Sequence, residues 1–488
     1  MRSLTTTRTR KLTSLSSIDL VPAFLGRQQT CGRHVRILAL VAALIMLDGV
    51  DLQLLALTTP LIVDDWEIDA AVMAPALTAA LVGMAVGTLV GGWLEDRLGR
   101  RRVILFSATF FGIMTLATSQ AWDVTALTGI RFLAGCGFGA VTPNIYSLSG
   151  EIFPAGLRAR VMGLLAVGIP LGGVIGAGIA LVAIGPLGWR GCFVLVGVIT
   201  IAVVTAAWRG LPESPSYYFM SGSVEKAVST LHRITGRSAD EIRTLADAVA
   251  VEVHDGTTAT DGYNETDDGG IFGSRSLRLT VGASISFFAL FFITYGFLNW
   301  QPALLESAGL ALDTVLQASL VLNVMSTVGG LLVAVGLDRI GSRVTIISGA
   351  VVAAGVLASM PMLISVAVDG SGGGEIALFV SIAAIGFIIG YVGATLYANV
   401  AVGYPIRFRS SGVGFAAAVA RSAGIVVTFT GGFLLSAATS GVMFFVTLVA
   451  MSVFSVIGAL INNRQIVPFR RRLPDSRAAR HRDARALE

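Results

Sequence analysis

The sequence predicts an all-α polytopic membrane protein in which twelve transmembrane helices form two six-helix halves. Three observations lead to this prediction: an apolar composition, a series of apolar runs of membrane-spanning length, and a charged loop that occurs twice. Of the 488 residues, 54% are hydrophobic and only 13% are charged, and the mean hydropathy is +0.78. Soluble domains carry about 25% charged residues, so the composition excludes an ordinary soluble domain.

Apolar runs long enough to cross a bilayer recur along the whole chain. A spanning helix needs about 20 mostly apolar residues. The predicted spans are 37–62, 71–94, 103–121, 124–147, 161–184, 190–209, 279–301, 314–337, 343–367, 376–400, 411–436 and 440–462. The 57 glycines suit such a bundle, because a residue without a side chain lets neighbouring spanning helices approach closely.

A polar stretch between the sixth and seventh spans divides the chain. Its first part, "SGSVEKAVSTLHRITGRSADEIRTLADAVAVEV", predicts one or two surface helices, and "HDGTTATDGYNETDDGG" predicts a flexible segment. The predicted parts are an N-terminal tail at 1–36, a six-helix bundle at 37–209, a central loop at 210–278, a second six-helix bundle at 279–462 and a basic tail at 463–488.

The arginines indicate which side of the membrane each loop faces. They gather in both tails and in the loops "EDRLGRRR", "EIFPAGLRAR", "DRIGSR" and "YPIRFRSS", whereas opposite loops are acidic or neutral, as in "DDWEID" at 64–69. Cytoplasmic loops carry an excess of Lys and Arg, so we expect an inner-membrane protein with both termini in the cytoplasm. Residues 1–33 lack the apolar core of a cleaved signal peptide.

One charged loop occurs twice, at equivalent places of the two halves. "LEDRLGRR" at 94–101 follows the second span, and "LDRIGSR" at 337–343 follows the eighth. An offset of 242 residues aligns the two copies: Asp96, Arg97, Gly99 and Arg101 match Asp338, Arg339, Gly341 and Arg343. Such a match predicts a duplicated unit, as in transporters built from parallel repeats. A tight glycine turn lets the acid of one helix meet basic groups of its neighbour.

Two acids stand inside the first apolar run. Asp48 and Asp51, in "LDGVDL", are three residues apart and therefore share one face of a helix. A charge near the centre of a span costs about 2.5–3.5 kcal/mol on insertion scales. Since burial and a second acid both favour the protonated carboxyl, the pair is a candidate for proton coupling. The alternative is a hydrogen-bonded pair that only ties the first span to a neighbouring helix.

Two arginines also lie inside spans. Arg131 is in the fourth span and Arg421 is near the middle of the eleventh. A guanidinium matches a carboxylate in two hydrogen bonds and stays charged at any working pH. Each arginine can therefore hold an anionic substrate or pair with Asp48 or Asp51, and the sequence does not separate the two roles. Arg131 can also reach outward to the interface, so Arg421 is the preferred substrate anchor.

Polar and aromatic side chains within the spans suggest a cavity for a flat ring, since stacking and edge contacts suit an aromatic substrate. From them we select Asn144, Tyr391 and Tyr397 as candidate substrate-binding residues. Many such residues serve packing or the interfacial belt instead.

Several motifs resemble known transporters. "GGWLEDRLGRRRV" resembles the signature loop of the major facilitator superfamily, and "LPESPSYY" at 211–218 is similar to a segment of several of its branches. "DGVD" resembles the Asp-Gly-x-Asp pattern of the aromatic acid:proton symporter family. "RFLAGCGFGAVTPN" at 131–144, "YPIRFRSSGVGFAAAVARSAGI" at 404–425 and "YGFLNWQPALL" at 295–305 fit the same family.

The resemblance implies a major facilitator fold, a proton role for Asp48 and Asp51, and a gate at the cytoplasmic helix ends. In the family, equivalents of Asp96, Glu151 and Arg409 support gating and turnover. The candidate gate residues are Asp96, Arg97, Gly99, Arg100, Arg101, Glu151, Arg409, Asp338 and Arg339. The alternative is that these charges are solvated and only follow the positive-inside bias.

The expected function is proton-coupled import of a small aromatic carboxylate, such as a benzoate, a hydroxybenzoate or a phenylpropanoid acid. The alternatives are another cargo (a sugar, another organic acid or an exported drug) and a membrane sensor on the same scaffold. "GIPLGG" at 168–173 faintly resembles the antiporter pattern of the superfamily, but its spacing departs from it.

An enzyme is not expected, because no span holds a histidine and no nucleophile, metal or phosphate constellation is present. The three scattered cysteines suit neither a disulfide framework nor a metal site. No cofactor and no nucleic-acid partner are expected. The partners are the aromatic acid, protons and lipid, and one twelve-span chain suffices as a complete transporter.

Overall fold

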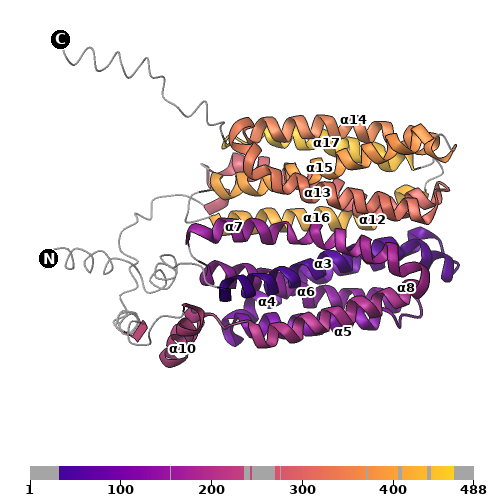
Figure 1. Ribbon diagram of the computed structural model, residues 1–488. Coiled ribbons are helices and arrows are strands. Elements are labelled where there is room, and N and C mark those ends of the chain that lie inside the picture. Colours follow the sequence, from indigo (N-terminus) through magenta and orange to yellow (C-terminus); the bar gives the residue numbers. More distant parts are fainter. Residues whose placement is uncertain are drawn as a thin grey trace, which may run out of the picture. The chain divides into compact units, whose positions relative to one another are not determined.

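The structure is a computed structural model. It describes residues 32–153, 155–221, 223–235, 242–243, 270–274, 276–369, 372–404, 409–436 and 441–466. These residues are mostly helical, and no β-strand occurs among them. Figure 1 shows the helices with the labels used below.

The helices up to the central loop begin with a long first span. They are α3 (Gly32–Asp65), η1 (Ala70–Met73), α4 (Ala74–Leu98), α5 (Arg100–Thr118), α6 (Val124–Ile152), α7 (Ala155–Ala166), α8 (Gly168–Gly210), α9 (Pro215–Met220) and α10 (Val224–Thr235). The amphipathic α10 confirms one of the surface helices predicted for the loop. The flexible segment predicted at 254–270 lies almost wholly outside the described residues.

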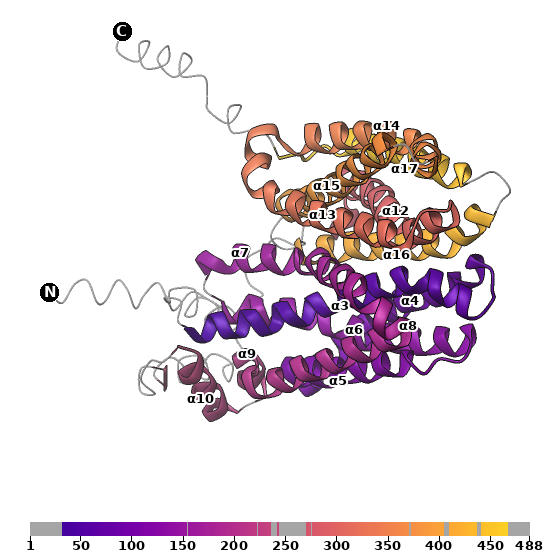
Figure 2. The ribbon, with the colours of Figure 1, turned by 45° about the vertical axis from the view of Figure 1, so that its right-hand side comes forward.

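The helices after the central loop are more regular. They are η2 (Gly270–Phe272), α12 (Leu277–Ser307), α13 (Leu312–Ile340), α14 (Ser342–Val368), α15 (Gly372–Gly403), α16 (Arg409–Ser436) and α17 (Val442–Ile461). Helices α14 and α17 lie side by side in both ribbon views, as do α5 and α6 (Figures 1 and 2).

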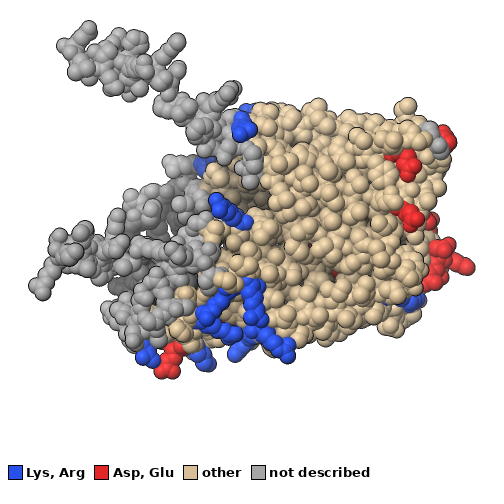
Figure 3. Space-filling model, in the orientation of Figure 1, with Lys and Arg blue, Asp and Glu red and all other residues tan. Residues whose placement is uncertain are grey.

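Eleven segments among the described residues are long and apolar enough to cross a membrane. One of them, 160–210, contains two spans. Helix α8 is interrupted at Gly188, whose φ of 63° and ψ of 179° are not helical. The break lies between the fifth and sixth predicted spans, so the described helices account for twelve spans and confirm the predicted fold class. Charged side chains on the face drawn in Figure 3 lie at helix ends and leave a broad uncharged surface between them.

The repeated loop adopts the same backbone conformation in both copies. Gly99 has φ 88° and ψ 154°, and Gly341 has φ 84° and ψ 153°. This region of φ and ψ is essentially restricted to glycine. Each glycine ends one spanning helix and starts the next, so the offset of 242 residues relates equivalent turns and confirms the predicted internal repeat.

Close packing of helix backbones also follows the repeat. Gly83 and Gly87 of α4 lie against the backbone of α6, where a Cβ would collide with the carbonyl oxygens of Phe132 and Cys136. Gly329 of α13, which the same offset aligns with Gly87, lies in the same way against Phe387 of α15. The glycine-rich composition thus provides helix contacts within each half.

The described chain divides into two compact units. The first comprises 1–51, 82–172 and 190–266, and the second comprises 52–81, 173–189 and 267–488. The core of the second unit contains Leu279, Phe287 and Val392, packed between α12, α14, α15 and α16. The residue limits proposed above for the tails, bundles and central loop stay predictions.

Candidate functional site

The first unit contains a buried ion pair between α3 and α6. Arg131 Nη1 donates to Asp51 Oδ1 at 2.9 Å, and Arg131 Nη2 donates to Asp51 Oδ2 at 2.6 Å. Asp51 is 3% exposed and Arg131 is 0% exposed. Thr115 of α5 donates a longer hydrogen bond of 3.4 Å to Asp51 Oδ1. The paired fork geometry gives a buried carboxylate the compensation that it needs.

The second acid of the motif has a different environment. Asp48 is 2% exposed and lies three residues before Asp51 on α3. Both terminal nitrogens of Arg131 donate to Asp51, so Asp51 is the acid of the motif that this guanidinium binds through both nitrogens.

An aromatic cluster in the second unit surrounds Tyr397 of α15. Its ring meets Phe287 edge-on, with centroids 4.9 Å apart, and Phe291 at 6.1 Å. Phe291 in turn approaches Tyr295, one turn further along α12, at 6.2 Å. Edge-to-face contacts of this kind are the arrangement that aromatic rings prefer.

The predicted anion anchor lies beside this cluster. Arg421 of α16 is half-buried, and its charge acts on the hydroxyl of Tyr397. Three residues further along α16, Gly424 lies against the ring of Tyr295, where a Cβ would be 2.6 Å from Cδ2. Residues three apart share a helix face. The second unit thus combines a guanidinium with aromatic edges, which is the chemistry that an aromatic carboxylate requires.

The other two candidate ring contacts lie elsewhere. Asn144 of α6 is fully buried, and its Nδ2 donates to Ala140 O one turn earlier at 2.8 Å. Tyr391 of α15 stacks on Phe387 at 5.6 Å, and its hydroxyl lies against Gly336 of α13. The structure therefore brings Tyr397 to Arg421, whereas Tyr391 packs against α13 and Asn144 belongs to the first unit.

Charged residues of the Gly99 turn form a network in the first unit. Arg100 pairs with Glu95 of α4 (Nε to Oε1, 2.5 Å) and with Glu151 of α6. Ser214 donates to Glu151, and Ser147 donates to Glu95 at 3.2 Å. The network joins α4, α5 and α6 to the segment that follows α8.

That segment also binds the turn itself. Arg101 donates its backbone N–H to Glu213 Oε1 at 2.8 Å, and its Nε to Leu211 O at 2.7 Å. Arg97 stacks its guanidinium over the ring of Trp93, 4.0 Å from the centroid. Glu95, Glu213 and Ser214 are missing from the residues predicted for the gate. In the sequence, the "LPESPSYY" motif is the signal for Glu213 and Ser214, and the position next to Asp96 is the signal for Glu95.

The equivalent turn of the second unit makes neutral contacts among the residues whose side chains are described. Ser342 donates its N–H to Ile466 O at 3.0 Å, and its hydroxyl to Gln465 at 2.6 Å. Arg339 is exposed. The side chains of Asp96, Asp338 and Arg409 lie outside the residues whose side chains the structure describes.

The glycines of "GIPLGG" have a packing role. A Cβ at Gly172 of α8 would collide with Met46 O of α3, and a Cβ at Gly49 of α3 would collide with Ile169 O. These glycines let α3 and α8 cross in close contact. Close packing therefore accounts for Gly172.

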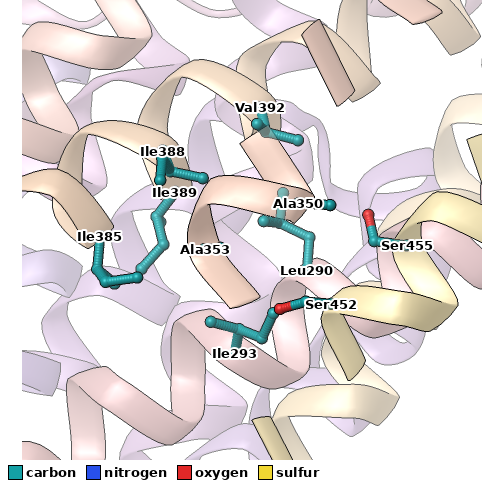
Figure 4. Close-up of a pocket in the computed structure, with 10 residues that line it drawn as sticks. All are labelled: Leu290, Ile293, Ala350, Ala353, Ile385, Ile388, Ile389, Val392, Ser452 and Ser455. Atoms are coloured by element: carbon teal, nitrogen blue, oxygen red, sulfur yellow. The ribbon is translucent and has the colours of Figure 1, made fainter. Parts of the chain in front are cut away.

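One enclosed cavity of the second unit is too small for a substrate. Its volume is about 10 Å³, which suits at most one water molecule. Figure 4 shows that helices α12, α14, α15 and α17 line it, mainly with aliphatic side chains. The lining residues are Leu290, Ile293, Ala350, Ala353, Ile385, Ile388, Ile389, Val392, Ser452 and Ser455.

The chain is similar to transporters of aromatic acids. It is 26% identical over 434 residues to the gallate transporter of Pseudomonas putida, covering 88% of this chain and 91% of that protein. It is 27% identical over 412 residues to the 4-hydroxybenzoate transporter of Acinetobacter baylyi, covering 83% and 85%. These relatives confirm the resemblance that the motifs of the first and eleventh spans predict.

A solved structure and a family model agree on the fold. The inward-open xylose transporter from E. coli superimposes with a TM-score of 0.67 at 17% identity, covering 88% of this chain and 96% of that one. The model of the Major Facilitator Superfamily matches residues 41–429. Since this match spans most of the sequence, the chain belongs to the major facilitator superfamily and is a multi-pass membrane transporter.

Proposed function

We propose that the protein imports a small aromatic carboxylate together with protons, by alternating access. The observation that carries this proposal is the pair of buried acids on α3, Asp48 and Asp51, of which Asp51 receives two hydrogen bonds from Arg131. The proposed location is a bacterial inner membrane with both termini in the cytoplasm, and a single chain suffices.

The substrate class rests on the second unit and on the relatives. Arg421 would hold the carboxylate through its planar fork, and the rings of Tyr397, Phe291 and Tyr295 would pack against the aromatic ring. The relatives named for gallate and 4-hydroxybenzoate carry acids of this class. A sugar would not require a guanidinium at this position.

Proton coupling follows from the charge of such a substrate. Moving an anion into a negative interior is opposed by about 2.3 kcal/mol per charge at 100 mV. One proton cancels this charge, and a second makes the cycle electrogenic in the inward direction. We assign the transported proton to Asp48, the buried acid on the same face of α3, because both terminal nitrogens of Arg131 already donate to Asp51.

The network around the Gly99 turn is proposed as the gate. Arg100, Glu95 and Glu151 connect three spanning helices, and Glu213 and Ser214 connect them to the chain after α8. Such a network has to rearrange when the helix ends separate. Asp96, Arg97, Gly99, Arg101, Arg409, Asp338 and Arg339 complete the set of proposed gate residues.

Uptake into proteoliposomes tests the proposal. Purified full-length protein is reconstituted, an inward proton gradient is imposed, and radiolabelled 4-hydroxybenzoate, benzoate, gallate and xylose are compared. We expect the acids to accumulate, a protonophore to abolish accumulation, and xylose to stay outside. Failure to take up any aromatic acid would reject the substrate class. Gradient-driven loss of preloaded acid would instead identify an exporter.

A further inference from the structure

The second unit carries an open groove between α13 and α14. The two helices diverge from their turn at Gly341, each packs along α15, and they touch one another little. Helix α15 therefore forms the floor of a groove of about 520 Å³. Its lining residues are Met325, Ile340, Thr345, Ser348, Gly349, Val352, Val380, Ala383, Ala384, Phe387, Ile388, Tyr391 and Val392.

The groove is suited to hydrocarbon. The two hydroxyl groups that α14 contributes to the groove both donate to backbone carbonyls. Thr345 donates to Gly341 O at 3.0 Å, and Ser348 donates to Thr345 O at 3.4 Å. Its rim is exposed and apolar, with Val352 52% and Val380 62% exposed. In a membrane protein such an exposed apolar surface faces lipid.

The length of the groove matches one acyl chain. Its floor runs from Val380 to Val392 on α15, about 18 Å at the helical rise of ~1.5 Å per residue. Half of a bilayer's hydrocarbon core is about 15 Å thick. A chain that lies in the groove would therefore extend through one leaflet.

The end of the groove at Ile340 is flanked by positive charge. Arg339 precedes Ile340 at the end of α13, and Arg343 follows at the start of α14. Both side chains are exposed. Guanidinium groups bind phosphate strongly, and basic sites at helix ends bind anionic lipid head groups. The charge and the apolar groove thus meet at one helix turn.

The equivalent positions in the first unit carry larger side chains. The offset of 242 residues aligns Ser348 and Val352 of α14 with Phe106 and Phe110 of α5. Phe106 packs on Trp208 with centroids 5.3 Å apart, and Phe110 lies close to Gly137 of α6. The second unit thus has a serine and a valine beside the groove where the first unit has two phenylalanines.

We propose that this groove binds one acyl chain of an anionic phospholipid whose phosphate lies between Arg339 and Arg343. The proposal does not depend on the transported substrate. It makes two separable demands on the ligand, a negative phosphate and an acyl chain, and the groove and the arginines can be altered independently.

Native mass spectrometry of the full chain in detergent tests the proposal by titration. The probes are phosphatidylglycerol, phosphatidylcholine with the same chains, and glycerol phosphate, which has no chains. We expect one phosphatidylglycerol to bind, at a concentration roughly tenfold or more below that needed for phosphatidylcholine, given two arginines at the head group. Equal binding of glycerol phosphate would overturn the acyl-chain assignment.

Two double variants separate the head group from the groove. R339Q/R343Q should bring phosphatidylglycerol binding to the level of phosphatidylcholine, and S348F/V352F, which introduces the residues of the first unit, should weaken both lipids. The control R102Q/R209Q removes two exposed arginines of the first unit and should change neither. Unchanged phosphatidylglycerol binding in R339Q/R343Q would overturn the proposal even if S348F/V352F fails to fold.

Discussion

Arg131 of α6 binds Asp51 of α3 through two parallel hydrogen bonds, of 2.9 and 2.6 Å, in the buried interior of the first unit. The same helix presents a second buried acid, Asp48, that does not receive these two bonds. The pattern Asp-Gly-x-Asp therefore contains two buried carboxylates three residues apart, and Arg131 binds one of them. This arrangement is the basis of the proposed proton coupling.

The Asp51–Arg131 pair should be strongly cooperative. Removing one partner leaves an uncompensated buried charge, so Asp51→Leu and Arg131→Met should each lower the free energy of unfolding by about 3–5 kcal/mol. The double variant replaces the pair by apolar groups and should lose much less than the sum of the two single losses. Chemical unfolding in detergent measures all three; additive losses would contradict a direct buried pair.

Arg421 should control substrate affinity. A hydrogen bond to a charged group contributes about 1.5–3 kcal/mol, so Arg421→Gln should raise the concentration for half-maximal uptake of 4-hydroxybenzoate by roughly tenfold or more. Arg421→Lys keeps the charge but loses the planar fork. Its concentration for half-maximal uptake should therefore lie between those of the wild type and Arg421→Gln. Ser422→Ala, at the exposed neighbouring position, is the control. An unaltered concentration dependence in Arg421→Gln would remove Arg421 from the substrate site.

An added methyl group should destabilise both glycine turns. Alanine at φ near +85° and ψ near +153° costs about 1–3 kcal/mol, so Gly99→Ala and Gly341→Ala should both lower the unfolding temperature. Gly99→Ala should lower it further, because its Cβ would lie 2.7 Å from Glu213 Oε2. Gly92→Ala is the control, because a Cβ added at Gly92 would have no neighbouring atom within 4 Å. Equal stability of all three variants would show that the turns are not constrained as described.

The spans and the repeat were predictable because both depend on local sequence. Hydropathy identifies the part of a helix that lies in hydrocarbon, but helices continue beyond it. The first span is predicted at 37–62, whereas α3 runs from Gly32 to Asp65, and the fourth is predicted at 124–147, whereas α6 ends at Ile152. The extra turns add charged residues such as Arg33, Asp65 and Glu151, which hydropathy does not assign to a span.

The partners within the site were not predictable, because they depend on helix rotation and on contacts distant in sequence. Asp51 and Arg131 are 80 residues apart, and the sequence left substrate binding and ion pairing equally open for Arg131. Tyr391 and Tyr397 are six residues apart on α15 and so point about 120° apart at 3.6 residues per turn. Only the packing of α15 decides which of them meets Arg421.

Glu213 illustrates the same limit at the proposed gate. It accepts the N–H of Arg101 from 112 residues away, so no local pattern identifies it as a partner of the Gly99 turn. The motif "LPESPSYY" marked the segment without indicating which of its atoms bind, or where.

The most direct test of the account compares two transport modes in Asp48→Asn. We predict that the variant exchanges labelled for unlabelled 4-hydroxybenzoate across the membrane, because the substrate site is intact, but does not accumulate it under an inward proton gradient. Thr59→Val is the control: this buried α3 hydroxyl donates only within its own helix, to Leu55 O at 2.8 Å, and the variant should behave as wild type in both assays. Gradient-driven accumulation by Asp48→Asn at the wild-type level would contradict the assignment of the transported proton to Asp48.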